Sequence, residues 1–145
     1  MRDEDPAVAP LMDGIIETAL YVDDLPRARR FYVDVIGCAP LLESSRLVAL
    51  SVASRSVLLL FQRGATEAPL PTAGGVVPGH GASGAQHFAF AIAAGTVDEW
   101  ERRFAGAGVA IESRVRWERG GESLYVRDPD GHSVELATPG LWAIY

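Results

Sequence analysis

The sequence has little cysteine, no long apolar run and no cluster of basic residues. It contains a single cysteine, Cys38, so no disulfide can form within the chain. No apolar stretch approaches membrane-spanning length, and the acidic, proline-containing start MRDEDPAVAP lacks the basic and apolar regions of a signal peptide. We therefore expect a cytoplasmic protein that does not interact with a membrane.

The acidic balance also argues against nucleic-acid binding. The net charge is −6, whereas a nucleic-acid footprint needs clustered Lys and Arg. The arginines are scattered and fit a solvated surface. With 145 residues, 48% of them hydrophobic, the chain is long enough for one soluble domain with a substantial core. Cys38 follows a glycine in an expected helix-to-strand turn, which favours a buried structural thiol.

The order strand, helix and three strands occurs twice along the chain. The first set is expected at 15–22, 24–36, 39–43, 46–53 and 56–62. The second is expected at 87–93, 96–108, 109–117, 122–128 and 132–138. Asp24 is expected to cap the first helix, and Thr96 the second in a capping box with Glu99. The repeat predicts an α+β fold of two tandem βαβββ modules, whose mixed sheets curl around a central cleft.

Composition sets the boundaries of the remaining segments. We expect an N-terminal arm at 1–13, modules at 14–63 and 86–137, a connection at 64–85 and a tail at 138–145. The connection is rich in Gly and Pro, which is typical of a solvated linker. Because it contains His80, the alternative is a loop that lies over the cleft. The sequence Asp-Pro-Asp-Gly at 128–131 is expected to be a turn without a chemical role.

Three side chains able to bind a metal are expected on the faces turned away from the helices. In QHFAFAI the bulky residues alternate with His87, which therefore faces the cleft. Glu17 matches it at an offset of 70 residues, and Glu135 has the same orientation in HSVELAT. Each residue alone has a simpler explanation. His87 could be a hydrogen-bonded core histidine, Glu17 could pair with an arginine, and Glu135 could be a charge at the rim of the cleft. Together, two carboxylates on a mostly apolar face repel, and a divalent cation relieves that cost.

The segments ETALYVDDLPRARRFYVDVIG, QHFAFAI and LYVRDPDGHSVELATPG resemble the vicinal oxygen chelate superfamily, over about 14–140. This superfamily includes glyoxalase I, fosfomycin-resistance transferases, extradiol dioxygenases and bleomycin-resistance proteins. The resemblance implies one divalent metal ion (Mn, Fe, Ni, Co, Zn or Mg) held by Glu17, His87 and Glu135. The fourth ligand of glyoxalase-type members falls near Leu58, within one residue, and leucine cannot bind a metal. Three protein ligands leave open positions for substrate.

The resemblance further implies a metal-dependent enzyme with lyase or isomerase chemistry. The metal would act as a Lewis acid on a small molecule that chelates through two oxygens, with Glu17 or Glu135 as catalytic base. An extradiol-type dioxygenase is less favoured, because non-haem iron oxygenases use two histidines and one carboxylate. The alternative from another class is a metal-free protein that sequesters a cationic, bleomycin-type drug in an acidic cleft.

Further expectations concern the substrate and the assembly. His80, Trp117, Tyr125 and Arg127 are candidate substrate-binding residues, with Arg127 suited to an anionic group. Small members of the superfamily often form homodimers that share the cleft. In that case Glu17 of one subunit would complete the site of His87 and Glu135 in the other. Alternatively, the two modules of one chain close on each other.

Overall fold

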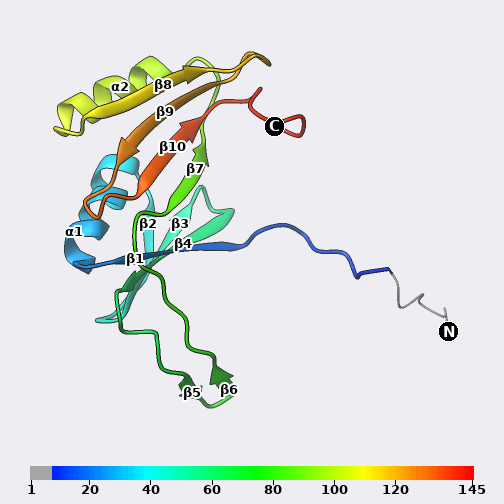
Figure 1. The fold of residues 1–145 in the computed structure, drawn as a ribbon, viewed down its shortest axis with the longest axis vertical. Coiled ribbons are helices and arrows are strands. Elements are labelled where there is room, and N and C mark those ends of the chain that lie inside the picture. Colours follow the sequence, from blue (N-terminus) through cyan, green and yellow to red (C-terminus); the bar gives the residue numbers. More distant parts are fainter. Residues whose placement is uncertain (1–7) are drawn as a thin grey trace.

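Each half of the chain forms one four-stranded sheet in the computed structural model, which describes residues 8–145 (Figure 1). The strand order is β1-β4-β3-β2 in the first sheet and β7-β10-β9-β8 in the second. In both sheets the first strand pairs in parallel with the last, and the other pairs are antiparallel. The predicted α+β fold of two tandem βαβββ modules is therefore confirmed.

The element boundaries lie close to those expected from the sequence. The first module comprises β1 (Glu17–Val22), α1 (Leu25–Arg30), the π-helical η1 (Phe31–Ile36), β2 (Ala39–Glu43), β3 (Leu47–Val52) and β4 (Ser56–Gln62). The second comprises β7 (His87–Ala91), α2 (Val97–Gly106), β8 (Ile111–Arg116), β9 (Glu122–Arg127) and β10 (Ser133–Ala137). Of the expected N-terminal arm, residues 1–7 lie outside the described residues, and 8–13 form no helix or strand.

The connection between the modules contains a small hairpin that its composition did not predict. Its strands are β5 (Leu70–Thr72) and β6 (Gly75–Val77), and both are fully exposed. Figure 1 shows this hairpin projecting from the end of the first module that lies away from the second. Three-residue strands are too short to produce a recognisable period in the sequence.

The two helices begin differently. The Asp24 side chain accepts a hydrogen bond from the Arg27 amide at 3.0 Å, so this predicted cap is confirmed. The predicted capping box at Thr96 is wrong. The Thr96 hydroxyl donates to the Ala93 carbonyl at 2.6 Å and makes no bond to the first turn of α2. The backbone at Thr96 is not extended, so its hydroxyl is turned toward the preceding chain.

One hydrophobic core runs through both modules. It contains Leu20, Leu50 and Leu60 of the first sheet together with Leu124, Val134 and Leu136 of the second. Tyr32 joins the halves, because its ring lies 6.2 Å from Phe88 and 6.5 Å from Phe90, centroid to centroid. The helical segment of the first module therefore packs against the second sheet as well as its own.

Burial along β1 falls toward its N-terminal end. Leu20, Tyr21 and Val22 are buried, whereas Glu17 and Thr18 are exposed. Ile16, expected to face the helix, is 66% exposed, and that expectation is wrong. It precedes the strand, beyond the half of β1 that the core covers.

Cys38 is buried and unpaired, as the sequence predicts. Burial raises the pKa of its thiol to about 11, so the thiol is protonated at neutral pH. Both observations fit a structural residue. Among residues 8–145, no helix is both long enough and apolar enough to cross a membrane.

A buried polar network links the modules around the turn at 128–131. The Asp128 carboxylate accepts from the Tyr32 hydroxyl at 2.6 Å and from the backbone amide of His132 at 2.9 Å. The His132 ring is fully buried, and its Nδ1 accepts a hydrogen bond from the backbone amide of Gln86 at 2.9 Å. Its Nε2 lies 2.9 Å from the Tyr21 carbonyl. Because a carbonyl can only accept, the ring hydrogen is on Nε2, and both ring nitrogens are satisfied.

Ionisation of Tyr32 is expected to destabilise the protein at high pH. Burial, and then the charge of Asp128, raise the pKa of Tyr32 above its ordinary value. The unfolded chain therefore loses this proton first, and stability falls as pH rises above the ordinary tyrosine value. One such group contributes a slope of about 1.4 kcal/mol per pH unit there.

The comparison of wild type with Tyr32→Phe isolates this contribution, because Cys38, Tyr125 and Tyr145 also have raised pKa values. Urea unfolding from pH 8 to 11 should give a shallower decline for the variant. Parallel declines in the two proteins would contradict the assignment.

Candidate functional site

His87 and Glu135 meet on one face of the second sheet. His87 begins β7, and Glu135 lies in the middle of β10, which pairs with β7 in parallel. The alternating neighbours Val134 and Leu136 are fully buried in the core, so Glu135 points to the opposite face. The His87 Nε2 atom lies 3.3 Å from Glu135 Oε1. The structure thus brings together two of the three predicted metal ligands.

The His87 ring is oriented by its second nitrogen. Nδ1 lies 3.0 Å from the Ser133 carbonyl, which can only accept, so Nδ1 carries the hydrogen. Nε2 lies beside a carboxylate oxygen, and a proton or a metal cation between the two atoms would relieve the repulsion of their lone pairs. A histidine that donates through Nδ1 to a carbonyl and presents Nε2 is the usual arrangement of a metal ligand. The chemistry of this pair fits a divalent metal.

Glu135 is held by side chains of β9 and of the turn before it. Its side chain is 7% exposed. Its Oε2 atom accepts from the Ser123 hydroxyl at 2.5 Å, and the Ser123 Oγ accepts from the Trp117 indole at 2.8 Å. The Oε2 atom of the Glu135 carboxylate is therefore hydrogen-bonded to Ser123 of β9, and the Oε1 atom faces His87. Trp117 was predicted to contact substrate, and here its polar atom is directed to Ser123.

Tyr125 lies beside both residues. Its ring stacks on the His87 ring with centroids 6.3 Å apart. Burial, and then the negative charge of Glu135, raise the pKa of Tyr125. At neutral pH the phenol is therefore protonated and can donate a hydrogen bond to a bound oxygen. Tyr125 has a position suited to its predicted role in substrate binding.

Glu17 lies on the first sheet, apart from this pair. It is the first residue of β1, is exposed, and pairs with Val57. Within residues 8–145, no three His, Cys, Asp or Glu side chains of one chain lie close enough to hold a single ion. The predicted set of Glu17, His87 and Glu135 is thus not assembled by one subunit.

The strand register identifies the position matched to the fourth ligand, which was expected within one residue of Leu58. Glu135 pairs with Ala89, two residues after His87, and Leu59 pairs with Ala19, two residues after Glu17. The counterpart of Glu135 is therefore Leu59. Leu58, named from the sequence, is 1% exposed and faces the core. Since leucine stands at both positions, a fourth protein ligand is missing there, as predicted.

His80 and Arg127 already have partners within the chain. His80 Nδ1 lies 2.6 Å from the Tyr21 hydroxyl, and its ring packs edge-on against Phe61. The connection therefore contacts the first sheet, which also carries Glu17. Arg127 donates to both oxygens of Glu112, at 2.6 and 3.1 Å. An anionic substrate would have to compete with that carboxylate for the guanidinium.

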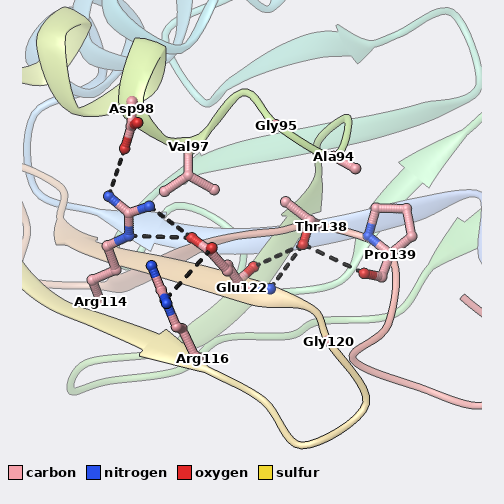
Figure 2. Close-up of a pocket in the computed structure, with 10 residues that line it drawn as sticks. All are labelled: Ala94, Gly95, Val97, Asp98, Arg114, Arg116, Gly120, Glu122, Thr138 and Pro139. Atoms are coloured by element: carbon pink, nitrogen blue, oxygen red, sulfur yellow. Dashed lines mark hydrogen bonds and ion pairs between the residues drawn. The ribbon is translucent and has the colours of Figure 1, made fainter.

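A separate polar pocket lies on the helix-covered side of the second sheet (Figure 2). Its volume is about 280 Å³, and Arg114 and Glu122 are among its lining residues. Arg114 bonds Asp98 of α2 at 2.8 Å and Glu122 of β9 at 2.7 Å. The bond from Arg114 lowers the pKa of Asp98. These paired charges connect α2 to the sheet.

The sequence-based interpretation missed Ser123 and His132. Alternation along ESLYVRD places Ser123 and Tyr125 on the same face as Glu135, so the pattern contained a signal for Ser123. Nothing local identified His132, whose partners Tyr21 and Gln86 are 111 and 46 residues away.

Comparison with solved structures supports this fold. A crystal structure of lactoylglutathione lyase from Agrobacterium tumefaciens is 40% identical, with a TM-score of 0.82 over 91% of this chain and 98% of that chain. The fosfomycin resistance protein FosX from Listeria monocytogenes shares the fold, with 20% identity and a TM-score of 0.66 over 90% of this chain and 97% of that one.

The sequence comparisons agree. The metallothiol transferase FosB of Bacillus licheniformis is 40% identical over 57 residues, which are 39% of this chain and only 37% of that protein. The model of one family matches residues 14–136, from three residues before β1 to the residue before the end of β10. Because that match spans both βαβββ modules, the chain belongs to the Glyoxalase/Bleomycin resistance protein/Dioxygenase superfamily.

Proposed function

We propose that the protein is a metal-dependent enzyme with lyase or isomerase activity on a small molecule that offers two oxygen atoms. The observation that carries this proposal is the pair of His87 and Glu135, whose Nε2 and Oε1 atoms converge while their other polar atoms are bound within the sheet. The 40% identity to a lactoylglutathione lyase over nearly the whole chain supports this reaction class.

The metal would be held by His87 and Glu135 of one subunit and Glu17 of a second. Support for a homodimer comes from exposed apolar side chains on and next to the first sheet. Ile15, Ile16, Leu41 and Leu42 are each more than half exposed in the single chain. Apolar surface of this kind is stabilised when a partner covers it. A second copy in that place would also supply the missing carboxylate.

The contacts and exposure of each residue of the site suggest the role that it would have in the reaction. When bound, a divalent metal supplies Lewis-acid polarisation of substrate oxygens and stabilises developing negative charge. The neutral Tyr125 phenol, which lies beside His87 and Glu135, would donate a hydrogen bond to a substrate oxygen. Glu135 is held by Ser123, whereas Glu17 is exposed. We therefore assign the catalytic base to Glu17, which is freer to move toward a substrate proton.

A metal-dependent thiol transferase is the second candidate. The local identity to a metallothiol transferase favours it. In this reaction the sulfur of the thiol would form a bond to a carbon while the bond from that carbon to oxygen breaks. A metal held by the same residues would stabilise the charge left on that oxygen, so the two reactions would differ in substrate rather than in ligands. The exposed Glu17 would then take the proton of the incoming thiol.

The test begins with protein purified without chelators. We expect about one divalent metal per chain, and lactoylglutathione lyase activity that a chelator removes and one of Mn, Fe, Co, Ni, Zn or Mg restores. Activity only in fosfomycin thiol transfer would select the second candidate. Metal-free protein that binds a cationic drug such as bleomycin would instead show a sequestering protein and contradict both.

A further inference from the structure

We propose that Trp117 and Ser123 are positioning residues that restrict Glu135 to a single metal-binding oxygen, Oε1. This inference rests on the proposed function, because it concerns how a ligand of that metal is oriented. It assigns a role to two residues that do not touch the metal, and it changes the expected role of Trp117 from substrate contact to ligand control.

The direction of the hydrogen bonds follows from the chemistry of the donors. The indole N–H of Trp117 can only donate, and it lies 2.8 Å from Ser123 Oγ. The Ser123 hydroxyl therefore accepts there, and its single hydrogen is available for Glu135 Oε2 at 2.5 Å. Ser123 is fully buried, so water does not compete for this hydrogen. A short bond to a carboxylate is among the stronger hydrogen bonds in proteins.

The two oxygens of Glu135 are thus made unequal. Oε2 is bound by Ser123, and Oε1 lies 3.3 Å from His87 Nε2. Without the Ser123 hydrogen, Oε2 loses its buried donor, and the Tyr125 hydroxyl is the side-chain partner that remains to Glu135. Nothing then ties Oε2 to β9, and the carboxylate can rotate so that this oxygen also faces the metal. Chelation by both oxygens would then occupy a position that a two-oxygen substrate needs.

The position of Trp117 is itself fixed. Its backbone amide donates to the Gly121 carbonyl at 2.8 Å, which closes the turn between β8 and β9. A Cβ atom on Gly121 would lie 2.8 Å from the backbone carbonyl carbon of Gly140, so the turn packs directly against the C-terminal segment. The turn therefore fixes the backbone from which the Trp117 indole reaches Ser123.

The experiment compares Co²⁺ binding in four variants with that of the wild type. Ser123→Ala removes the donor to Glu135, Trp117→Phe removes only the indole N–H, and Ser123→Thr keeps a hydroxyl. Trp142→Phe is the matched control, because Trp142 is 67% exposed. We expect Ser123→Ala to weaken Co²⁺ binding by roughly 10- to 100-fold, the range for partners of metal ligands.

The visible spectrum of bound Co²⁺ gives a second readout that a loss of stability alone would not change. Weaker absorption in Ser123→Ala, from a higher coordination number, should accompany the lower affinity. Trp117→Phe should change the spectrum in the same direction by less, and Ser123→Thr and Trp142→Phe should match the wild type. In metal-free protein, the NMR signal of the Trp117 indole N–H should shift in Ser123→Ala and Glu135→Gln.

The possible failures are distinguishable. If the wild type binds no Co²⁺, the proposed function fails, and this inference fails with it. If the wild type binds Co²⁺ but Ser123→Ala and Trp117→Phe retain its affinity and spectrum, only the positioning role is overturned. If Ser123→Ala does not fold, Trp117→Phe decides alone, since it keeps an aromatic ring. An equal change in Trp142→Phe would also overturn the assignment.

Discussion

Glu135→Gln is expected to lose stoichiometric metal and to lower kcat/KM by roughly 10³-fold, which is about 4 kcal/mol of transition-state stabilisation. The amide oxygen of glutamine can still accept from Ser123, so the buried bond and the fold should persist. What disappears is the negative charge beside His87 Nε2, which a divalent cation needs. The effect should therefore fall on metal binding and catalysis, with little change in stability.

Metal content after dialysis and steady-state kinetics measure this outcome. Glu101→Gln is the matched control, because it removes one negative charge from α2, where Glu101 pairs with Arg114. It should retain metal and activity. Full metal occupancy in Glu135→Gln would exclude Glu135 as a ligand and leave the pair with His87 as a simple ion pair.

The second large effect is expected in His132→Ala, with a loss of about 3 to 4 kcal/mol in the free energy of unfolding. His132 is fully buried and connects Gln86 in the second module to Tyr21 in the first. Truncation leaves a cavity and a backbone N–H of Gln86 without its acceptor, and it reduces the donors to the Tyr21 carbonyl to the Arg63 guanidinium at 3.1 Å. Any one of these is costly, and together they account for the expected size.

Urea unfolding monitored by circular dichroism measures the loss. His132→Asn, which keeps a side-chain carbonyl able to accept from the Gln86 amide, should lose less than His132→Ala. Because Gln86 directly precedes His87, His132→Ala should also weaken metal binding. A loss of less than about 1 kcal/mol would show that the two modules do not depend on this bridge.

The sequence predicted the features of the fold that depend on local residue patterns. Two-residue alternation placed His87 and Glu135 on one face, and the internal repeat identified the paired modules. Matching the two sequence segments left one residue of uncertainty around Leu58 for the position matched to Glu135, and the strand pairing gives Leu59. Similarly, the identity of a helix cap depends on backbone angles, and these made Asp24 a cap but not Thr96.

Hydrogen bonds between residues far apart in the sequence could not be predicted from local sequence patterns. The Tyr32 hydroxyl and Asp128 are 96 residues apart, and nothing near either residue indicates the other. The turn at 128–131 was predicted from its composition, but the buried network around it required the fold. Glu17 shows the same limit in another form, because a strand pattern gives the face on which a residue lies and not the side chains that it meets there.

Subunit mixing tests the central claim most directly. Glu17→Ala and His87→Ala proteins, each metal-free and inactive alone, are denatured together in equal amounts and refolded. If the site is shared, half of the dimers are mixed and each has one intact site of two, so about a quarter of the wild-type metal content and activity should return. If the mixture stays as inactive and metal-free as its components, Glu17 of one subunit does not join His87 and Glu135 of another.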